Sequence, residues 1–392
     1  MTTTLRSRIA SVGLALGDSS VDLRPTTVVN PRERIRGERD DGGVNTTVVP
    51  DHSVETASFE PRGPLSAQLL AVLRKDPALS EAGDVAGAAA RALEISTDIV
   101  RDDDIQLALF LLYASHYGSL DFIDAGWEWH PMLIAARGML ERAFEETLRE
   151  RVEMRALPAP TRDAVARALF ALTAPTPGPS LSRFVAKKAT DEQLREFLIQ
   201  RSVYTLREAD PHSWAIPRLT GAAKAALVEI QSDEYGTGDL SRMHSRIFAR
   251  TVRAAGLDDT YGAYVDAVPA VTLASLNMMS MFGLNRRLVG AIVGHLAAFE
   301  MTSSLPNRMY GDGFRRLGFG PEATHYFDEH VEADAVHEQI AGRDLAGGLA
   351  EDRPDLLGDI MFGAAACLTV DGWVGDEMLA AFESGRSSLR DV

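Results

Sequence analysis

The chain has 392 residues, of which 45% are hydrophobic, and a formal net charge of −16 with a sequence pI near 5.0. An acidic balance of this size repels phosphate backbones and anionic lipids, so we expect neither nucleic acid nor a membrane among its partners. Cys367 is the single cysteine, which excludes internal disulfides and fits a cytoplasmic location. It also argues against a structural zinc site, because such sites favour cysteine ligands.

Three regions follow one another along the chain. Residues 1–62 are rich in Thr, Arg, Asp and Gly and lack sustained apolar periodicity, which predicts a flexible N-terminal tail. Residues 63–178 place apolar side chains at three- and four-residue intervals, the pattern of amphipathic helices. A Pro- and Gly-rich segment at 174–182 then leads into a second helical region, 179–392, and either separates two subdomains or forms a loop within one domain.

No convincing alternating strand pattern occurs, so the sequence predicts an all-α protein. The segments AVTLASLNMMSMFGL and RLVGAIVGHLAAFE are apolar nearly all round, which predicts helices buried at the centre of a bundle. No stretch after the tail is long and apolar enough, without interruption, to cross a bilayer.

The segment HYFDEHVEADAVHEQIA carries the strongest chemical signal. His330, Asp334 and His337 are spaced by four and then three residues, which places two imidazoles and a carboxylate on one face of a helix. Ligands of this kind suit a first-row transition metal. Acidic residues surround the trio, however, so an exposed acidic helix without a metal is the alternative reading.

Two upstream segments carry the same ligand chemistry. Glu234 ends one helical pattern and His244 begins the next, and the glycines between them allow both side chains to turn towards one point. Glu208 comes near the end of an earlier buried helix, just before the stop at Pro211. Taken singly, His244 is more readily interpreted as a helix cap or surface residue, and Glu208 as an ordinary exposed carboxylate.

Together these segments resemble the haem-oxygenase-like di-iron oxidases, also called iron-containing redox enzymes. The resemblance is carried by YTLREADPHSWAIPRL, AKAALVEIQSDEYGTGDLSRMH and HVEADAVH, in that order, and covers about the last half of the chain. It implies an all-α, haem-oxygenase-like helical bundle, here with additional N-terminal helices. The metal ligands that it implies are Glu208, Glu234, His244, His330, Asp334 and His337.

The resemblance also implies two Fe(II) ions as cofactor, O2 as co-substrate and a small molecule as substrate: an amino acid, a fatty acid or a biosynthetic intermediate. Three carboxylates and three imidazoles suffice for two irons and leave positions open. Relatives that oxygenate amine nitrogens tend to carry a further carboxylate where this chain has Ser241, with Asp239 two residues away. We therefore expect hydrogen abstraction from carbon, leading to desaturation, C–C cleavage or decarboxylation.

Other readings stay open from the sequence alone. They are an N-oxygenase of an amine on the same di-iron site, a cofactorless oxidase on the same scaffold, and a non-catalytic helical binding protein. Glu300 and His295 lie in an otherwise apolar segment and are set outside the ligand group, as hydrogen-bonded neighbours of it. Glu322 and His325 have the spacing of a ferritin-like motif, but the motif occurs only once, so we interpret them as neighbours of the ligand group or as surface residues. A homodimer is compatible with the sequence.

Overall fold

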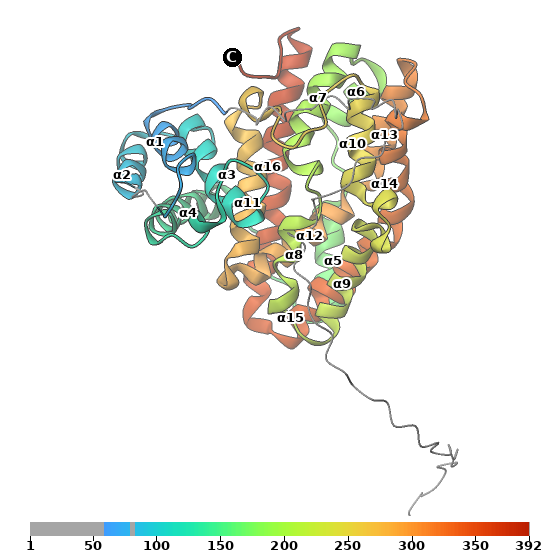
Figure 1. Ribbon diagram of the computed structural model, residues 1–392. Helices are drawn as coiled ribbons and strands as arrows, with labels where there is room; N and C mark the ends of the chain where they lie inside the picture. Colours follow the sequence, from blue (N-terminus) through green and yellow to red (C-terminus); the bar gives the residue numbers. More distant parts are fainter. Residues whose placement is uncertain (1–58, 79–82, 392) are drawn as a thin grey trace, which may run out of the picture. The chain divides into compact units, whose positions relative to one another are not determined.

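Helices account for the regular structure of the computed structural model, which describes residues 59–78 and 83–391 but not the side chains of 332–335 (Figure 1). Within these residues there is no strand, and the all-α prediction is confirmed. The predicted tail over residues 1–62 lies almost wholly outside the described residues.

The α-helices of the described chain are α1 Pro64–Leu73, α2 Val85–Ile95, α3 Asp103–Tyr117, α4 Pro131–Arg151, α5 Arg162–Thr173, α6 Leu181–Lys187, α7 Asp191–Thr205, α8 Asp210–Ser213, α9 Gly221–Glu234, α10 His244–Ala254, α11 Ala270–Leu284, α12 Val289–Met301, α13 Ser304–Arg316, α14 Pro321–Gln339, α15 Gly348–Asp352 and α16 Leu357–Glu383. A π-helix, η7 Ile340–Gly347, joins α14 to α15 without a break. The described residues belong to one compact unit. The Pro- and Gly-rich segment connects α5 to α6, and the proposed division of the chain at 178/179 stays a prediction.

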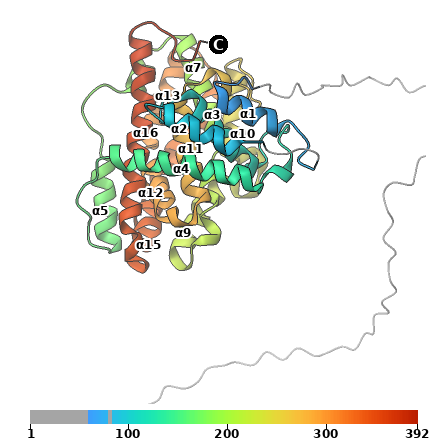
Figure 2. The same cartoon turned by 90° about the vertical axis from the view of Figure 1, so that its left-hand side faces the viewer.

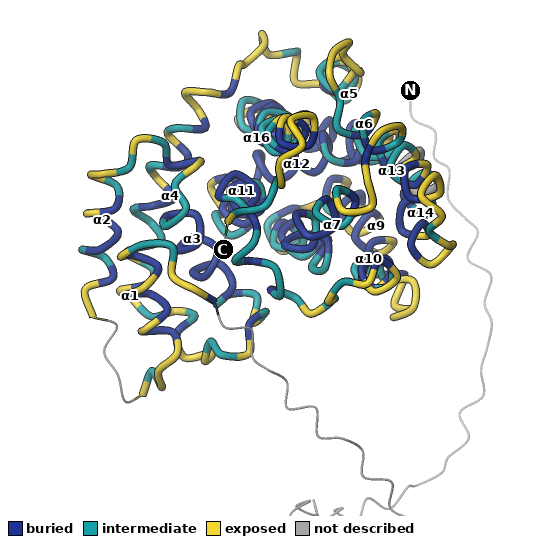
Figure 3. Tube along the Cα trace, turned by 90° about the horizontal axis from the view of Figure 1, so that it is seen from above, coloured by how far each residue is buried: buried dark blue, intermediate teal, exposed yellow. Residues whose placement is uncertain are grey.

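Three apolar helices form the centre of this unit. α11 and α12 bury nearly their whole circumference, as their sequences predict, whereas α16 is buried mainly in its first half. Figure 3 shows the trace of α11 largely buried. α12 and α16 approach closely because each has a glycine at the crossing: Gly294 faces the backbone of Ile360, and Gly363 faces the backbone of Ala291. A side chain at either glycine would meet main-chain atoms of the other helix.

The N-terminal helices pack against this centre. α3 lies against α11, while α2 and α4 lie side by side (Figures 1 and 2). Figure 2 shows α4 running crosswise to α16, and Arg149 of α4 joins the two through a 2.9 Å ion pair with Asp359. α1–α4 therefore belong to the same hydrophobic core as α11, α12 and α16.

A second, aromatic cluster is formed by α6, α7, α10, α13 and α14. Phe197, Phe248, Phe314, Tyr326 and Phe327 are its large buried side chains. α14 and α7 thus face this cluster on one side, while α9 and η7 lie together and η7 contacts α12. The candidate site lies where these elements meet.

One helix of the described residues, Pro354–Glu383, is long and apolar enough to cross a membrane by length and composition, and a bent pair, Arg286–Met301 with Ser304–Arg316, passes the same test together. Of the most apolar stretch of Pro354–Glu383, 56% is buried inside the structure, as in the core helix of a bundle. The cytoplasmic location stays a prediction.

Candidate metal centre

Glu208 lies in the turn between α7 and α8. α7 ends at Thr205, and Ala209 has a left-handed φ of 73°, which reverses the chain before α8. Gln231 of α9 holds this turn by donating a 2.9 Å hydrogen bond to the Ala209 carbonyl. The carboxylate of Glu208 is consequently buried, and the hydroxyl of Tyr326 donates to both of its oxygens, at 2.7 and 3.0 Å.

Glu234 and His244 face each other across a glycine turn. Glu234 is the last residue of α9 and His244 the first of α10, and both are buried. Gly236 has a φ of +64°, and a Cβ there would lie 2.7 Å from the backbone of Arg242 and Met243, so only glycine fits. His244 Nδ1 lies 3.0 Å from Glu234 Oε2, as the glycine break predicts.

α14 contributes two buried histidines. His330 Nδ1 lies 2.8 Å from the carbonyl oxygen of Tyr326, and its Nε2 lies 3.6 Å from Glu208 Oε1. His337 Nε2 lies 3.1 Å from Asp233 Oδ2, while its Nδ1 lies 3.3 Å from Glu300 Oε2 and 3.9 Å from Glu234 Oε1. The reading of this helix as an exposed acidic one is therefore wrong for His330 and His337. The side chain of Asp334 lies outside the described residues.

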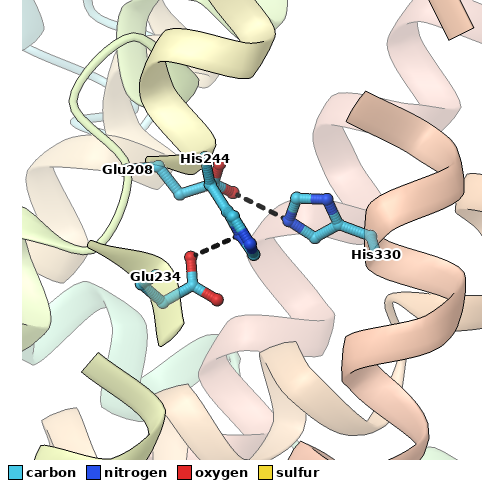
Figure 4. Close-up of side chains that lie close together, drawn as sticks. All are labelled: Glu208, Glu234, His244 and His330. Atoms are coloured by element: carbon cyan, nitrogen blue, oxygen red, sulfur yellow. Dashed lines mark ion pairs between the residues drawn. The ribbon is translucent and has the colours of Figure 1, made fainter. Parts of the chain in front are cut away.

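These side chains form two overlapping groups. Glu208, Glu234, His244 and His330 make the first (Figure 4), and their ligand atoms lie within 4.8 Å of one another. Glu234, Glu300 and His337 make the second, within the same limit. Because Glu234 belongs to both groups, its two oxygens can serve two adjacent cations.

Glu300 was set outside the ligand group from the sequence, but the structure brings it into the second one. It projects from α12 and is 5% exposed. The signal for it in the sequence was a carboxylate in an otherwise apolar helix, since a buried carboxylate requires a partner. The residues with which it would be grouped, Glu234 and His337, are distant in the sequence and could not be read from it.

Other residues considered from the sequence lie outside both groups. Ser241 and Asp239 are exposed, and the Ser241 hydroxyl donates to Asp239 at 2.7 Å. His295 lies 3.1 Å from His212, ring nitrogen to ring nitrogen, and burial lowers the pKa of His212 to about 4. Glu322 and His325 are exposed on α14, as expected.

The site holds protons as well as negative charge. Burial raises the pKa of Glu234, but the nearby imidazolium of His244 outweighs burial and brings this pKa down to about 2. Burial likewise lowers the pKa of His337, yet the carboxylates of Glu300, Asp233 and Glu234 raise it to about 9. Burial raises the pKa of Glu300, with the Glu234 charge adding to the rise and His337 opposing it.

The donor set fits a divalent transition metal. The Nδ1 atoms of His244 and His337 are buried, and although carboxylates lie nearby, neither atom makes a hydrogen bond of good geometry. An unsatisfied buried nitrogen beside a carboxylate is costly in the metal-free protein and is a ready ligand for a cation. Mixed imidazole and carboxylate donors suit iron.

Comparison with known proteins places these residues in a family. Residues 195–372 match the model of the family described as iron-containing redox enzyme. This region belongs to that family. The assignment made from the sequence is thereby confirmed for the region, which contains both ligand groups in full. The matched region runs from within α7 to within α16 and includes all the helices between them.

A curated relative carries a name. Nitrosourea synthase from Streptomyces achromogenes subsp. streptozoticus is 29% identical to the chain over 162 residues, which is 41% of this chain and 34% of the relative. The chain therefore matches about a third of the relative's length. At this coverage the relative supports the assignment of the matched region to the iron-containing redox enzymes. The match does not extend the relative's activity to this chain.

Proposed function

We propose that this protein is a non-haem iron oxidoreductase that uses two Fe(II) ions and O2 to oxidise a small molecule. The observation that carries the proposal is the pair of buried ligand groups sharing Glu234. Glu208, His244 and His330 would hold one ion, and Glu300 and His337 the other, together with Asp334 from the sequence pattern. Glu234 would contact both.

The histidines are oriented for this role by their neighbours. The Tyr326 carbonyl can only accept, so His330 donates through Nδ1 and leaves the Nε2 lone pair facing Glu208. His337 donates through Nε2 to Asp233, which leaves Nδ1 facing Glu300 and Glu234 once its proton is lost. Tyr326 also holds Glu208 in place through its hydroxyl.

Bound iron would react with O2 and supply the oxidising power for removing hydrogen from the substrate. The protein positions the ligands and excludes bulk water from the site. Tyr204, Leu296 and Phe299 line the small space beside Glu208, Glu234 and Glu300, so apolar walls face the ligands. Such walls favour oxidation of the substrate over side reactions with water.

Abstraction from carbon remains our first proposal for the outcome, leading to desaturation, cleavage or decarboxylation. The exposed Ser241 offers no ligand, which agrees with that choice. Two observations favour oxygenation of nitrogen as the second candidate. A nitrosourea contains a nitrogen–oxygen bond, so the relative's name is consistent with oxygenation of nitrogen. In addition, Glu300 supplies the site with a further carboxylate, although from a different position than that of Ser241.

Anaerobic titration with Fe(II), followed by admission of O2, tests the proposal. We expect two irons per chain and oxygen consumption that follows iron content. His330→Ala and His337→Ala should each lose iron while keeping their helical content, and the exposed His325→Ala on the same helix should behave as wild type. No uptake of iron by the wild-type chain would contradict the proposal and favour a cofactorless oxidase or a binding protein.

Glu300→Gln tests the second ion separately. Loss of one anionic donor should weaken the second iron by at least about tenfold and leave the first in place, as judged by stoichiometry at limiting iron. Glu141→Gln is the matched control, since Glu141 is a buried carboxylate on α4 outside both groups. If Glu300→Gln binds two irons as tightly as wild type, Glu300 is not a metal ligand and only lies beside the ligand group.

A further inference from the structure

A cavity of about 500 Å³ adjoins the candidate metal centre. Its walls come from α7, α11, α12, α13 and α16. Tyr204 and Phe299 line both this cavity and the small space at Glu208, Glu234 and Glu300. Their rings meet edge to face with centroids 5.6 Å apart, and this aromatic pair therefore lies at the boundary of the two spaces.

The size and lining of the cavity suit a small organic molecule. Apolar side chains from four helices cover much of its wall, among them Phe197, Leu276, Met279 and Met378. Binding sites for small molecules are typically of this volume, mostly apolar, with a few charged groups that fix orientation. The charged groups of this cavity therefore indicate what it would bind.

Four charged residues line the cavity: Arg183 and Asp376 are exposed, whereas Arg201 and Asp371 are more deeply placed. Arg201 lies on α7 and Asp371 on α16, and both are partly buried. Among the described residues, Arg201 forms no ion pair within 4.0 Å; burial lowers its pKa, but nearby Tyr326, Tyr310, Glu208 and Asp371 outweigh burial and raise it. Asp371 accepts a 2.6 Å hydrogen bond from Ser275 and a weak one from Cys367 at 3.7 Å, again with no cation at ion-pair distance in this part of the chain.

Removing a guanidinium and a carboxylate from water is costly unless each is paired. Arg201 and Asp371 are near enough for each charge to act on the other, yet they form no ion pair within 4.0 Å. Both line the same partly open cavity, where a ligand could contact them. An arginine can grip a carboxylate through two parallel hydrogen bonds, and an aspartate can accept from an ammonium group.

We propose that this cavity binds a small zwitterion carrying a carboxylate and an ammonium group, with Arg201 holding the carboxylate and Asp371 the ammonium. The cavity would be the substrate site of the oxidoreductase proposed above, so the inference rests on that function. The remainder of the molecule then lies against the apolar walls and reaches the ligands past Tyr204 and Phe299. An amino acid has this arrangement of charges, whereas a fatty acid satisfies only Arg201.

Calorimetric binding of the proteinogenic L-amino acids and of linear carboxylic acids, to metal-free and anaerobic Fe(II)-loaded protein, tests the inference. Each amino acid that binds is compared with its methyl ester and its deamino acid. We expect the ester, and Arg201→Gln with the amino acid itself, to bind about 10- to 100-fold more weakly, because a charge-assisted hydrogen-bonded pair is lost. Arg201→Lys should restore part of the affinity.

Two further variants sharpen the experiment. Asp371→Asn should bind the amino acid and its deamino analogue about equally, because it no longer recognises the ammonium group. Arg195→Gln is the matched control, since Arg195 lies on α7 outside the cavity and pairs with Asp191. It should bind as wild type.

Iron uptake is measured in every variant, which separates this inference from the proposed function. Arg201→Gln that takes up iron normally but loses the amino acid supports the inference. Any of four results would overturn it. These are equal binding by wild type and Arg201→Gln, equal binding of acid and ester, fatty acids binding as tightly as amino acids, and no binding by any compound. A wild-type chain that binds an amino acid through Arg201 but no iron would sink the proposed function alone.

Discussion

His330 and His337 lie on the same helix yet present different ring nitrogens to the site. The carbonyl of Tyr326 fixes Nδ1 of His330, whereas the carboxylate of Asp233 fixes Nε2 of His337. The ligand spacing on α14 therefore positions the rings, and residues from the same and a neighbouring helix decide which atom faces the metal. Asp233 is partly exposed but acts on a fully buried imidazole.

The proton on His337 links metal binding to pH. Its pKa is raised to about 9, so in the metal-free protein the charged form persists at neutral pH and is lost only as pH rises through about 9. A metal must displace that proton, and affinity for Fe(II) should rise up to about tenfold per pH unit between pH 7 and 9. Anaerobic calorimetry in buffers of different ionisation enthalpy should show release of at least one proton per site at pH 7.

Asp233→Asn provides the check on this prediction. Without the Asp233 charge the pKa of His337 falls, so fewer protons should be released at pH 7 and the pH dependence should become shallower. Glu229→Gln, an exposed change on the same helix, is the control. Identical proton release in wild type and Asp233→Asn would show that His337 is not the group displaced.

At the level of elements, the connection between α9 and α10 determines whether two of the ligands meet. Gly236 and Gly238 both have positive φ, at +64° and +87°, but only Gly236 is enclosed by backbone. The residue between them, Thr237, is also left-handed, with φ 52°. Three consecutive residues in this region make a reversal tight enough to bring the end of α9 to the start of α10.

Gly236→Ala should open this connection. Its Cβ would clash with the backbone of Arg242 and Met243 in addition to the strain of positive φ, and we expect a loss of about 1–3 kcal/mol of unfolding free energy with weakened metal binding. Gly238→Ala carries the same strain but has nothing within 4 Å of its Cβ, so it should cost less and retain the metal. Urea unfolding and iron titration of both variants provide the measurement; equal behaviour would argue against the tight turn.

At the scale of the whole molecule, the crossing of α12 and α16 fixes the position of the candidate metal centre relative to the adjacent cavity. α12 carries Glu300 towards the metal centre, and α16 carries Asp371 into the adjacent cavity. Close contact at Gly294 and Gly363 fixes the distance between these helices. A change in that distance would move a metal ligand and a cavity residue together.

Gly363→Ala should therefore affect stability and metal binding together. Its Cβ would lie 1.9 Å from the Ala291 carbonyl oxygen, and separating the helices should cost about 1–3 kcal/mol and weaken binding of the proposed second iron, which Glu300 would hold. Gly358→Ala on the same helix has nothing within 4 Å and should be neutral or stabilising by about 0.4–1 kcal/mol. Chemical unfolding of the two variants compares them; a Gly363→Ala chain as stable as wild type would show that the crossing is looser than described.

Local sequence pattern was sufficient for the helical fold and for several placements in the site. Apolar periodicity predicted the helices, because an amphipathic stripe is a property of adjacent turns. Spacing on α14 predicted that His330 and His337 share one face of a helix, and the glycines before His244 allowed Glu234 and His244 to turn towards one point, since helix geometry and positive φ are also local. Motif resemblance added Glu208 and the iron-containing redox enzyme family.

Tertiary structure alone decided which distant residues share these spaces. Glu300 joins the centre because α12 packs against α14 and η7, and nothing in its own apolar segment specifies those neighbours. Arg201 and Asp371 meet one cavity through the packing of α7 and α16 on α11 and α12. Periodicity identifies which face of a helix is buried but not what it is buried against, because hydrophobic burial is non-directional and the partner is chosen by the fit of many side chains at once.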